Sequence, residues 1–269
     1  MKIVVCFKVV PEFDQVVEED WNNFSLAVDL SYVNRVFGCF DESALETALR
    51  LRSAWEAGGE KTECTALTAS PLPPSLCKIL FAAGFDRVLD LWSGFHTDAE
   101  AVTSFEFHPR RTAAVLANYL NSAGYDIILA GRQAGYADTG TVPLSLAEAL
   151  GIPVVTGVEE MTLCDVGEIE IKRISDTVRE RLRVRPPIMA VLGNSPVSAL
   201  RAVTLSARMA ASKRSAETPA LSMARKTVAE ALRFSRDESH KTCRFLSARE
   251  DITEIVSKLR EEYPQRRER

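Results

Sequence analysis

The sequence predicts an α/β protein with a doubly wound, mostly parallel sheet, and three observations support this. Short apolar runs alternate with longer segments whose apolar residues recur at helical spacing, which is typical of strand–helix repeats. The first run, Lys2–Val10, is almost entirely apolar, as expected for a central strand covered on both faces. Glycine or proline also stands at most junctions between these runs, where helices and strands begin or end.

The first half of the chain reads as repeated units of strand and helix. Pro11 ends the first strand, and Val28–Val36 is expected to form a hairpin arm. Asp41 is expected to cap the first helix, which Gly58-Gly59 ends. The other predicted elements are strands at Thr62–Thr68, Asp86–Trp92 and Ile127–Ala130, and helices at Pro73–Ala83, at Arg110–Ala123 and between Pro143 and Gly151.

After Gly151 the pattern becomes rich in β-formers and predicts a meander or long hairpin, followed by one more sheet strand at Pro187–Leu192. The three β-rich runs are Val154–Cys164, Glu168–Ile174 and Val178–Val184. Arginines occupy every second position on one face of the last run, at Arg179, Arg181, Arg183 and Arg185. This face is expected to be solvated or to meet an acidic partner surface.

Beyond Gly193 the α/β rhythm ends, so residues 1–192 are expected to form a nucleotide-binding sheet domain and 193–269 an arm. Ser195–Arg214 is small and polar, and no helix is predicted there. Glu250–Tyr263 has apolar residues along one helical face and predicts a helix. An arm with one good helix and little core of its own is expected to lie on a partner.

Composition points to a soluble cytoplasmic protein. The chain has 269 residues, 46% of them hydrophobic and 26% charged, and no apolar run long enough to span a membrane. Its six cysteines are scattered and its three histidines lack ligand spacing, so neither disulfides nor a metal site is expected. Residues 1–200 hold 17 basic and 27 acidic side chains, whereas residues 201–269 hold 16 and 10. The basic end is expected to meet an acidic protein surface rather than nucleic acid.

The loop Gly131–Val142 is the main candidate site. It follows a short buried strand and precedes a helix that Pro143 opens, so it would present backbone N–H groups and a positive helix end to an anion. The ends of strands in a parallel sheet are also where ligands bind. An ordinary connection between strand and helix is the alternative, since the common phosphate-binding motifs are absent.

The same loop resembles the beta subunit of electron transfer flavoproteins. It reads Gly131-Arg132-Gln133-Ala134 and then Asp138-Thr139, where the family has G-[KR]-Q-A and an aspartate. Asp138, Thr139 and Val142 match the D-T-x-x-V form of bifurcating and nitrogen-fixation-type members. Tyr136, Thr141 and Pro143 depart from the usual pattern. Other segments of the chain also resemble the family and occur in the family's order. They are Cys6–Glu12, Phe40–Leu51, Thr68–Pro71, Ala82–Arg87, Asp176–Pro187 and Val203–Met209.

The resemblance implies a Rossmann-like subunit of a heterodimer, in which the alpha subunit holds most of a redox-active FAD. A second nucleotide, AMP or FAD, would be buried in this chain. The resemblance implies that Leu205 and Met209 dock the electron donor or acceptor, an acyl-CoA or other dehydrogenase and a quinone- or ferredoxin-linked protein. The implied cofactor-binding residues are Cys6, Phe40, Ala69, Gly131, Arg132, Gln133, Ala134, Asp138, Thr139, Gly140, Thr141 and Val142.

Two other function classes use the same sheet. A non-redox nucleotide-binding sensor would lack the basic arm and would form homodimers. An ATP-using enzyme would carry a pyrophosphate loop after the first strand, and Val10–Phe13 offers none. No acid, base or nucleophile with a catalytic setting stands out in the sequence, as expected for an electron carrier whose cofactor performs the chemistry.

Overall fold

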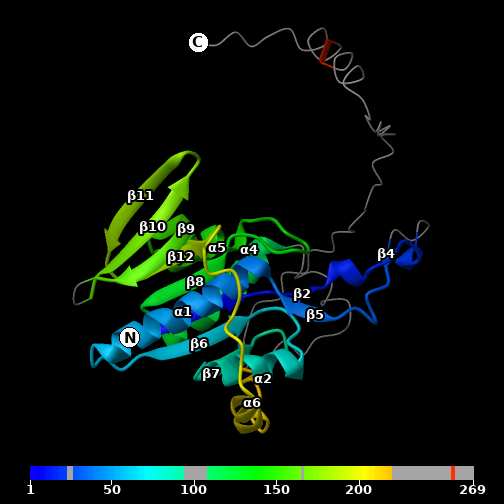
Figure 1. Cartoon of the computed structure of the whole chain (residues 1–269), viewed down its shortest axis with the longest axis horizontal. Coiled ribbons are helices and arrows are strands. Elements are labelled where there is room, and N and C mark those ends of the chain that lie inside the picture. The colour runs from blue at the N-terminus through cyan, green and yellow to red at the C-terminus, as the bar shows by residue number, and fades with distance from the viewer. Residues whose placement is uncertain (23–26, 94–107, 165–166, 220–255, 258–269) are drawn as a thin grey trace. The chain divides into compact units, whose positions relative to one another are not determined.

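The computed structural model describes residues 1–22, 27–93, 108–164, 167–219 and 256–257. The chain divides into two compact units, Met1–Thr227 and Val228–Arg269. In the second unit only Val256 and Ser257 are described, as part of a helical turn, so nearly all of the predicted helix Glu250–Tyr263 lies outside the described residues. The elements below belong to the first unit (Figure 1).

An eight-stranded sheet forms the centre of the first unit, in the order β11-β10-β9-β12-β8-β1-β6-β7. The six strands from β9 to β7 run parallel, and β10 and β11 continue the sheet antiparallel to their neighbours. The doubly wound α/β fold is therefore confirmed. The strands are β1 (Lys2–Phe7), β6 (Glu63–Thr68), β7 (Arg87–Asp90), β8 (Ile127–Gly131), β9 (Val154–Leu163), β10 (Ile169–Ser175), β11 (Val178–Val184) and β12 (Ile188–Leu192).

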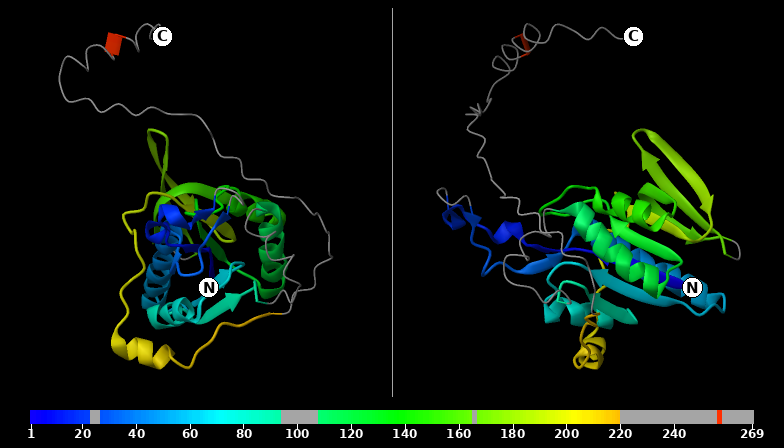
Figure 2. Two further views of the ribbon diagram at one scale, coloured as in Figure 1. Left: turned by 90° about the vertical axis from the view of Figure 1, so that its right-hand side faces the viewer. Right: turned by 180° about the vertical axis from the view of Figure 1, so that it is seen from behind.

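Helices cover both faces of the parallel strands. Helices α1 (Cys39–Ala57) and α2 (Pro74–Ala83) lie on one face, and α4 (Pro109–Ala123) and α5 (Val142–Leu150) lie on the other (Figures 1 and 2). Alternate side chains of β1 enter the two resulting cores: Ile3 and Val5 face α1, whereas Val4 faces α4. The predicted helices and strands of this region are thus present within a few residues of their expected ends.

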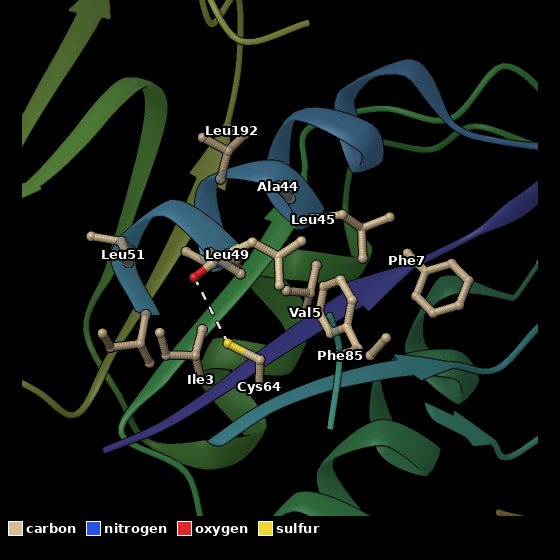
Figure 3. Packing of buried hydrophobic residues seen from close by; sticks show 14 of the residues in the cluster. Ile3, Val5, Phe7, Ala44, Leu45, Leu49, Leu51, Cys64, Phe85 and Leu192 are labelled. Atoms are coloured by element: carbon tan, nitrogen blue, oxygen red, sulfur yellow. Dashed lines mark hydrogen bonds between the residues drawn. The ribbon is translucent and has the colours of Figure 1, made fainter. Parts of the chain in front are cut away.

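The core beneath α1 is closely packed (Figure 3). Leu45 and Leu49 of α1 lie over Ile3 and Val5 of β1, and all four side chains are almost fully buried. Burial of side chains of this size contributes about 2 kcal/mol each, so this layer fixes α1 firmly on the sheet. The thiol of Cys64 donates a weak hydrogen bond to the carbonyl oxygen of Ala48 in α1, at 3.8 Å.

The first strand ends earlier than predicted, and the chain then leaves the sheet. Lys8 interrupts Lys2–Val10, and β2 (Val9–Pro11) pairs antiparallel with β5 (Arg35–Phe37). The backbone N–H of Lys8 donates to the Asp41 carboxylate instead of to a sheet strand. The expected hairpin arm is therefore present but begins at Val9. Its other elements are η1 (Phe13–Gln15), η2 (Glu18–Asp20), β3 (Trp21–Asn22) and β4 (Ala27–Val28).

The arginine face of β11 is exposed, as both of its expected interpretations require. Arg179, Arg181 and Arg183 all lie at the surface of this edge strand. Arg179 lies 3.8 Å from Glu159, and the structure gives no ion pair to Arg181 or Arg183 among the described residues. Leu182 and Val184, on the opposite face, pack against the core.

Residues 193–219 form a strap that crosses the α1–α2 side of the sheet, and it contains a helix that the sequence did not predict. Helix α6 spans Leu205–Ala211, and the hydroxyl of Thr204 caps it by accepting from the Ala207 N–H at 3.2 Å. The larger apolar side chains of α6, Leu205 and Met209, are exposed and only Ala211 is buried, so burial imposes no helical period on this segment.

Candidate functional site

A cavity opens where the chain order of the sheet reverses, between β1 and β8. From β1 the chain passes to β6 and β7 on one side, and then returns to β8 on the other. In open α/β sheets, ligands bind at such a switch point, outside the carboxyl ends of the strands. The cavity encloses about 880 Å³ of empty space, its mouth included.

The structure gathers most of the predicted cofactor-binding residues around this cavity. Eleven of the twelve line it: Cys6, Ala69, Gly131, Arg132, Gln133, Ala134, Asp138, Thr139, Gly140, Thr141 and Val142. Phe40 does not; its ring lies beneath the guanidinium of Arg132, 4.6 Å away. The lining comes from the ends of β1, β6 and β8, the loop after β8, the start of α5 and part of α4.

The loop is held in shape by Asp138. The carboxylate accepts from the Gly140 N–H at 2.9 Å and from the Ala134 N–H at 3.3 Å. Asp138 therefore acts on the amides of its own loop. Thr139 and Thr141 lie side by side, with their hydroxyl oxygens 3.0 Å apart. Hydroxyl groups at the mouth of the cavity can donate to an anion.

Several of the expected backbone donors are already bonded within the protein, including the Ala134 and Gly140 amides that donate to Asp138. The Gly131 N–H donates to the Asp41 carboxylate, and the Arg132 N–H donates to the Leu192 carbonyl oxygen at 2.9 Å. These two amides are therefore already used by acceptors of the chain itself. The start of α5 remains suitable, because no side chain caps it and its first residues line the cavity. The positive end of the helix dipole thus faces the cavity.

Asp41 is the least expected residue of the site. It is 5% exposed, and its carboxylate accepts from the Lys8 N–H at 2.9 Å and the Gly131 N–H at 3.0 Å. Gly38 occupies the N-cap position of α1, so the prediction that Asp41 caps this helix is wrong. Burial raises the pKa of Asp41 to about 7, although both amides and the Lys8 ammonium favour the ionised form.

The tip of the loop is tied to the other side of the cavity. The ammonium group of Lys8 donates to the carbonyl oxygen of Tyr136 at 2.6 Å and to that of Ala137 at 3.4 Å. The Tyr136 ring packs against Phe13 of the arm, with ring centroids 5.5 Å apart. Tyr136, which departs from the family pattern, is therefore turned toward the arm and does not line the cavity.

Sequence reasoning missed several lining residues besides Lys8 and Asp41. The apolar ones are contributed by α4 and by strand ends that are distant along the chain, and they include Trp92, Leu116 and Met189. No local signal distinguishes these residues from ordinary core positions. Lys8 could have been suspected, because it is a charged residue inside an otherwise apolar run.

Cys6 lines the cavity as expected, and its thiol is protonated. Burial raises its pKa to about 12, and the neighbouring Asp41 adds to the shift. All five cysteines in the described part of the chain are free, namely Cys6, Cys39, Cys64, Cys77 and Cys164. No cluster of three potential metal ligands occurs among the described residues. The same residues include no helix that is both long and apolar enough to cross a membrane.

The two predicted docking residues lie on the strap, away from the cavity. Leu205 is 73% exposed and Met209 is 68% exposed, and they lie one turn apart on α6. They form an apolar pair on the surface. Their helix packs on α2 through its opposite side, where Ala211 is buried.

Two salt-bridge clusters fix the strap on either side of α6. Before the helix, Arg201 donates to the buried Glu46 of α1 through its Nε at 2.9 Å and its Nη2 at 3.0 Å. After it, Glu217 forms two hydrogen bonds with Arg87, at 2.9 and 2.6 Å, and pairs with the backbone of β7. The position of the apolar pair on the body is therefore well defined.

Comparisons with known proteins agree with this arrangement. The model of the electron transfer flavoprotein domain matches residues 25–224. The chain is also 25% identical over 277 residues to a protein of Escherichia coli (strain K12) named "Putative electron transfer flavoprotein subunit YgcR", with 99% of each chain covered. The family model alone covers well over half of the sequence, including the cavity loop, the strap and every strand of the eight-stranded sheet except β1. The chain belongs to the electron transfer flavoprotein family.

Proposed function

We propose that this chain is the beta-type subunit of a heterodimeric electron transfer flavoprotein. In this proposal the alpha subunit holds most of the redox-active FAD, and the cavity at the switch point holds a second nucleotide. The observation that carries the proposal is the cavity itself, because it is formed by the loop Gly131–Val142 and an uncapped helix start in a member of this family.

The residues of the cavity suit an adenine nucleotide. Trp92, Leu116 and Met189 supply apolar surface for a flat ring. Thr139, Thr141 and the start of α5 supply hydroxyl and amide donors for phosphate oxygens. Both AMP and the adenine half of a second FAD have this combination of groups. A bound flavin would supply the electron-transfer chemistry, while this chain would hold and orient it.

The strap supplies the second part of the proposed function. Leu205 and Met209 would insert into an apolar pocket on a donor dehydrogenase or on a quinone- or ferredoxin-linked acceptor. A few side chains that become fully buried commonly supply most of the binding energy of such interfaces. The basic segment after the strap would lie on the alpha subunit, since this part of the chain carries an excess of positive charge.

The proposal is tested by co-expressing the chain with its cognate alpha subunit and analysing the nucleotides that the purified complex releases on denaturation. We expect a yellow heterodimer that contains one FAD and a second nucleotide, either AMP or FAD. The double substitution Asp138→Ala, Thr139→Val should remove the second nucleotide and leave the first flavin bound, because only the cavity loop is changed.

The same experiment separates the alternatives. A colourless homodimer that binds an adenine nucleotide would favour the non-redox sensor. A heterodimer with a single flavin and no second nucleotide would show that the loop Gly131–Val142 is only a structural connection. A Leu205→Ser variant serves as the control for the loop substitutions, because it lies outside the cavity and should retain both nucleotides.

A further inference from the structure

The carboxylate of Asp41 lies where the hydrogen bonding between the two central strands stops. Strands β1 and β8 are paired from Ile3 with Ile127 to Cys6 with Ala130. The next amide on β8, that of Gly131, donates to Oδ1 of Asp41, and the amide of Lys8 just beyond β1 donates to Oδ2. One carboxylate thus accepts from both chains at the point where they separate around the cavity.

The surrounding glycines fit this carboxylate closely. A Cβ atom on Gly131 would lie 2.5 Å from Oδ1 of Asp41, and one on Gly38 would lie 2.7 Å from Oδ2. Real Cβ atoms do not approach other atoms so closely, so both positions need glycine for Asp41 to reach the strand ends. Gly131 begins the cavity loop, and its small size is therefore explained by Asp41 and α1 rather than by a ligand phosphate.

The chain that follows β8 is linked to the residue after β1 a second time, through the side chain of Lys8. The side chain of Lys8 holds the tip of the cavity loop through the carbonyl oxygens of Tyr136 and Ala137. Asp41 therefore fixes the base of the loop, and Lys8 fixes its tip. Both residues line the cavity.

We propose that Asp41 is a positioning residue of the nucleotide cleft, which sets the spacing of its two walls by bridging the amides of Lys8 and Gly131. This inference rests on the proposed nucleotide site. The ionised carboxylate accepts from both amides, whereas a protonated or amidated side chain has only one good acceptor for two donors. Loss of the second bond lets the cavity loop move away from β1.

The charged and titratable groups that face Asp41 are few. On the β1 side they are the Lys8 ammonium and the protonated Cys6 thiol. On the β8 side Arg132 follows Gly131, with its guanidinium directed over Phe40. Asp41 is the group of this set whose pKa lies between pH 6 and 8.

The test compares Asp41→Asn with Asp90→Asn in the full chain, after co-purified nucleotide has been removed by dialysis. Asp90 is a matched control, because it is buried at the end of β7 but accepts only from Ser93 and does not line the cavity. Calorimetry with AMP should show at least a tenfold loss of affinity for Asp41→Asn and less than a twofold change for Asp90→Asn. Circular dichroism checks that both variants are folded.

A pH profile distinguishes positioning from a general structural role. Adenosine has no phosphate that titrates, so any pH dependence of its affinity comes from titrating groups of the protein. Its affinity for the wild-type chain should fall severalfold between pH 8 and pH 6, and the Asp41→Asn variant should lose this dependence. The wild-type profile needs no variant, so it tests the proposed role of Asp41 even if Asp41→Asn does not fold.

The outcomes separate this inference from the proposed function. If the wild-type chain binds neither AMP nor FAD, the proposed nucleotide site fails and the inference fails with it. If the wild-type chain binds AMP, a folded Asp41→Asn variant with affinity within threefold overturns the inference alone. A wild-type profile that is flat, or that rises toward low pH, also overturns it.

Discussion

Helix α1 carries two buried acidic side chains that the protein treats in opposite ways. Asp41, in the first turn at the cavity, accepts only from backbone amides. Glu46, further along the helix and 4% exposed, accepts from the guanidinium groups of Arg50 and Arg201 and from the Arg201 amide. The pKa of Asp41 is raised to about 7, whereas that of Glu46 is lowered.

The difference shows that the type of partner decides the charge state of a buried acid. Burial acts on both groups by disfavouring the ionised form. At Glu46 the hydrogen bonds and charge of two arginines outweigh burial, but at Asp41 two amides and a more distant ammonium do not. The strap is therefore anchored by a permanent ion pair, whereas the cavity wall depends on a group that titrates near neutral pH.

The largest expected effect is on the pH dependence of stability at Asp41. In the folded chain the Asp41 carboxyl group keeps its proton up to about pH 7, whereas in the unfolded chain it loses the proton near pH 3.8. A rise in pH between these values therefore favours unfolding. The change corresponds to about 4 kcal/mol, at about 1.4 kcal/mol per pKa unit. The free energy of unfolding of the wild type, minus that of Asp41→Asn, should fall by up to this amount between pH 4 and 7 and then level off.

Urea denaturation at several pH values measures this difference, and the variant serves as the baseline for all other titrating groups. A difference that stays constant across this range would mean that Asp41 is ionised throughout and behaves like Glu46. The comparison between the two ends of α1 would then be wrong.

The next effect concerns the anchor of the strap. Arg201→Ala should lower the free energy of unfolding by about 3 kcal/mol at pH 7, because it leaves the buried Glu46 carboxylate with only Arg50 and the amide of residue 201. This loss should shrink as the pH falls below 4.5, since the lowered pKa of Glu46 means that its stabilisation is lost as it becomes protonated. Urea denaturation of the wild type and of Arg201→Ala at each pH measures these free energies of unfolding.

Arg208→Ala is the matched control for Arg201→Ala. Arg208 is on the same strap and has no ion pair among the described residues, so its removal should change stability by less than about 0.5 kcal/mol. Equal losses for the two variants would indicate that positive charge in general, and not the Glu46 pair, stabilises the strap.

The fold could be predicted from the sequence wherever burial imposes a period on the side chains. The central strands are almost wholly apolar, and α1 shows its buried face at Ala44, Ala48, Leu51 and Trp55. The strap gave no such signal, because charged groups hold it in place and only one side chain of α6 is buried. Ion pairs between residues 155 positions apart, such as Glu46 with Arg201, leave no periodic trace in the sequence.

The site could be predicted in its loop but not in its walls. Gly131–Val142 is continuous in sequence, so its small residues and the following helix start were visible together. The role of Asp41 depends on which strands are neighbours, and the order of strands is a tertiary property. An aspartate beside the start of a helix is more often its N-cap, so the sequence pattern alone predicts that role for Asp41. The hydrogen bonds of its carboxylate with the Lys8 and Gly131 amides, and the N-cap position of Gly38, show otherwise.

The smallest expected effect separates the two regions in function. Leu205→Ala removes an exposed side chain, so stability and nucleotide content should stay unchanged, while the affinity of the heterodimer for its electron-transfer partner should fall about thirtyfold, or about 2 kcal/mol. Rates of interprotein electron transfer measured against partner concentration would show this as a higher KM at an unchanged flavin spectrum. Leu144→Ala is the control, because Leu144 is also exposed but lies on α5. If the two variants weaken the interaction equally, or if Leu205→Ala stays within twofold of the wild type, α6 is not the docking element, and the strap serves only to cover the edge of the sheet at β7.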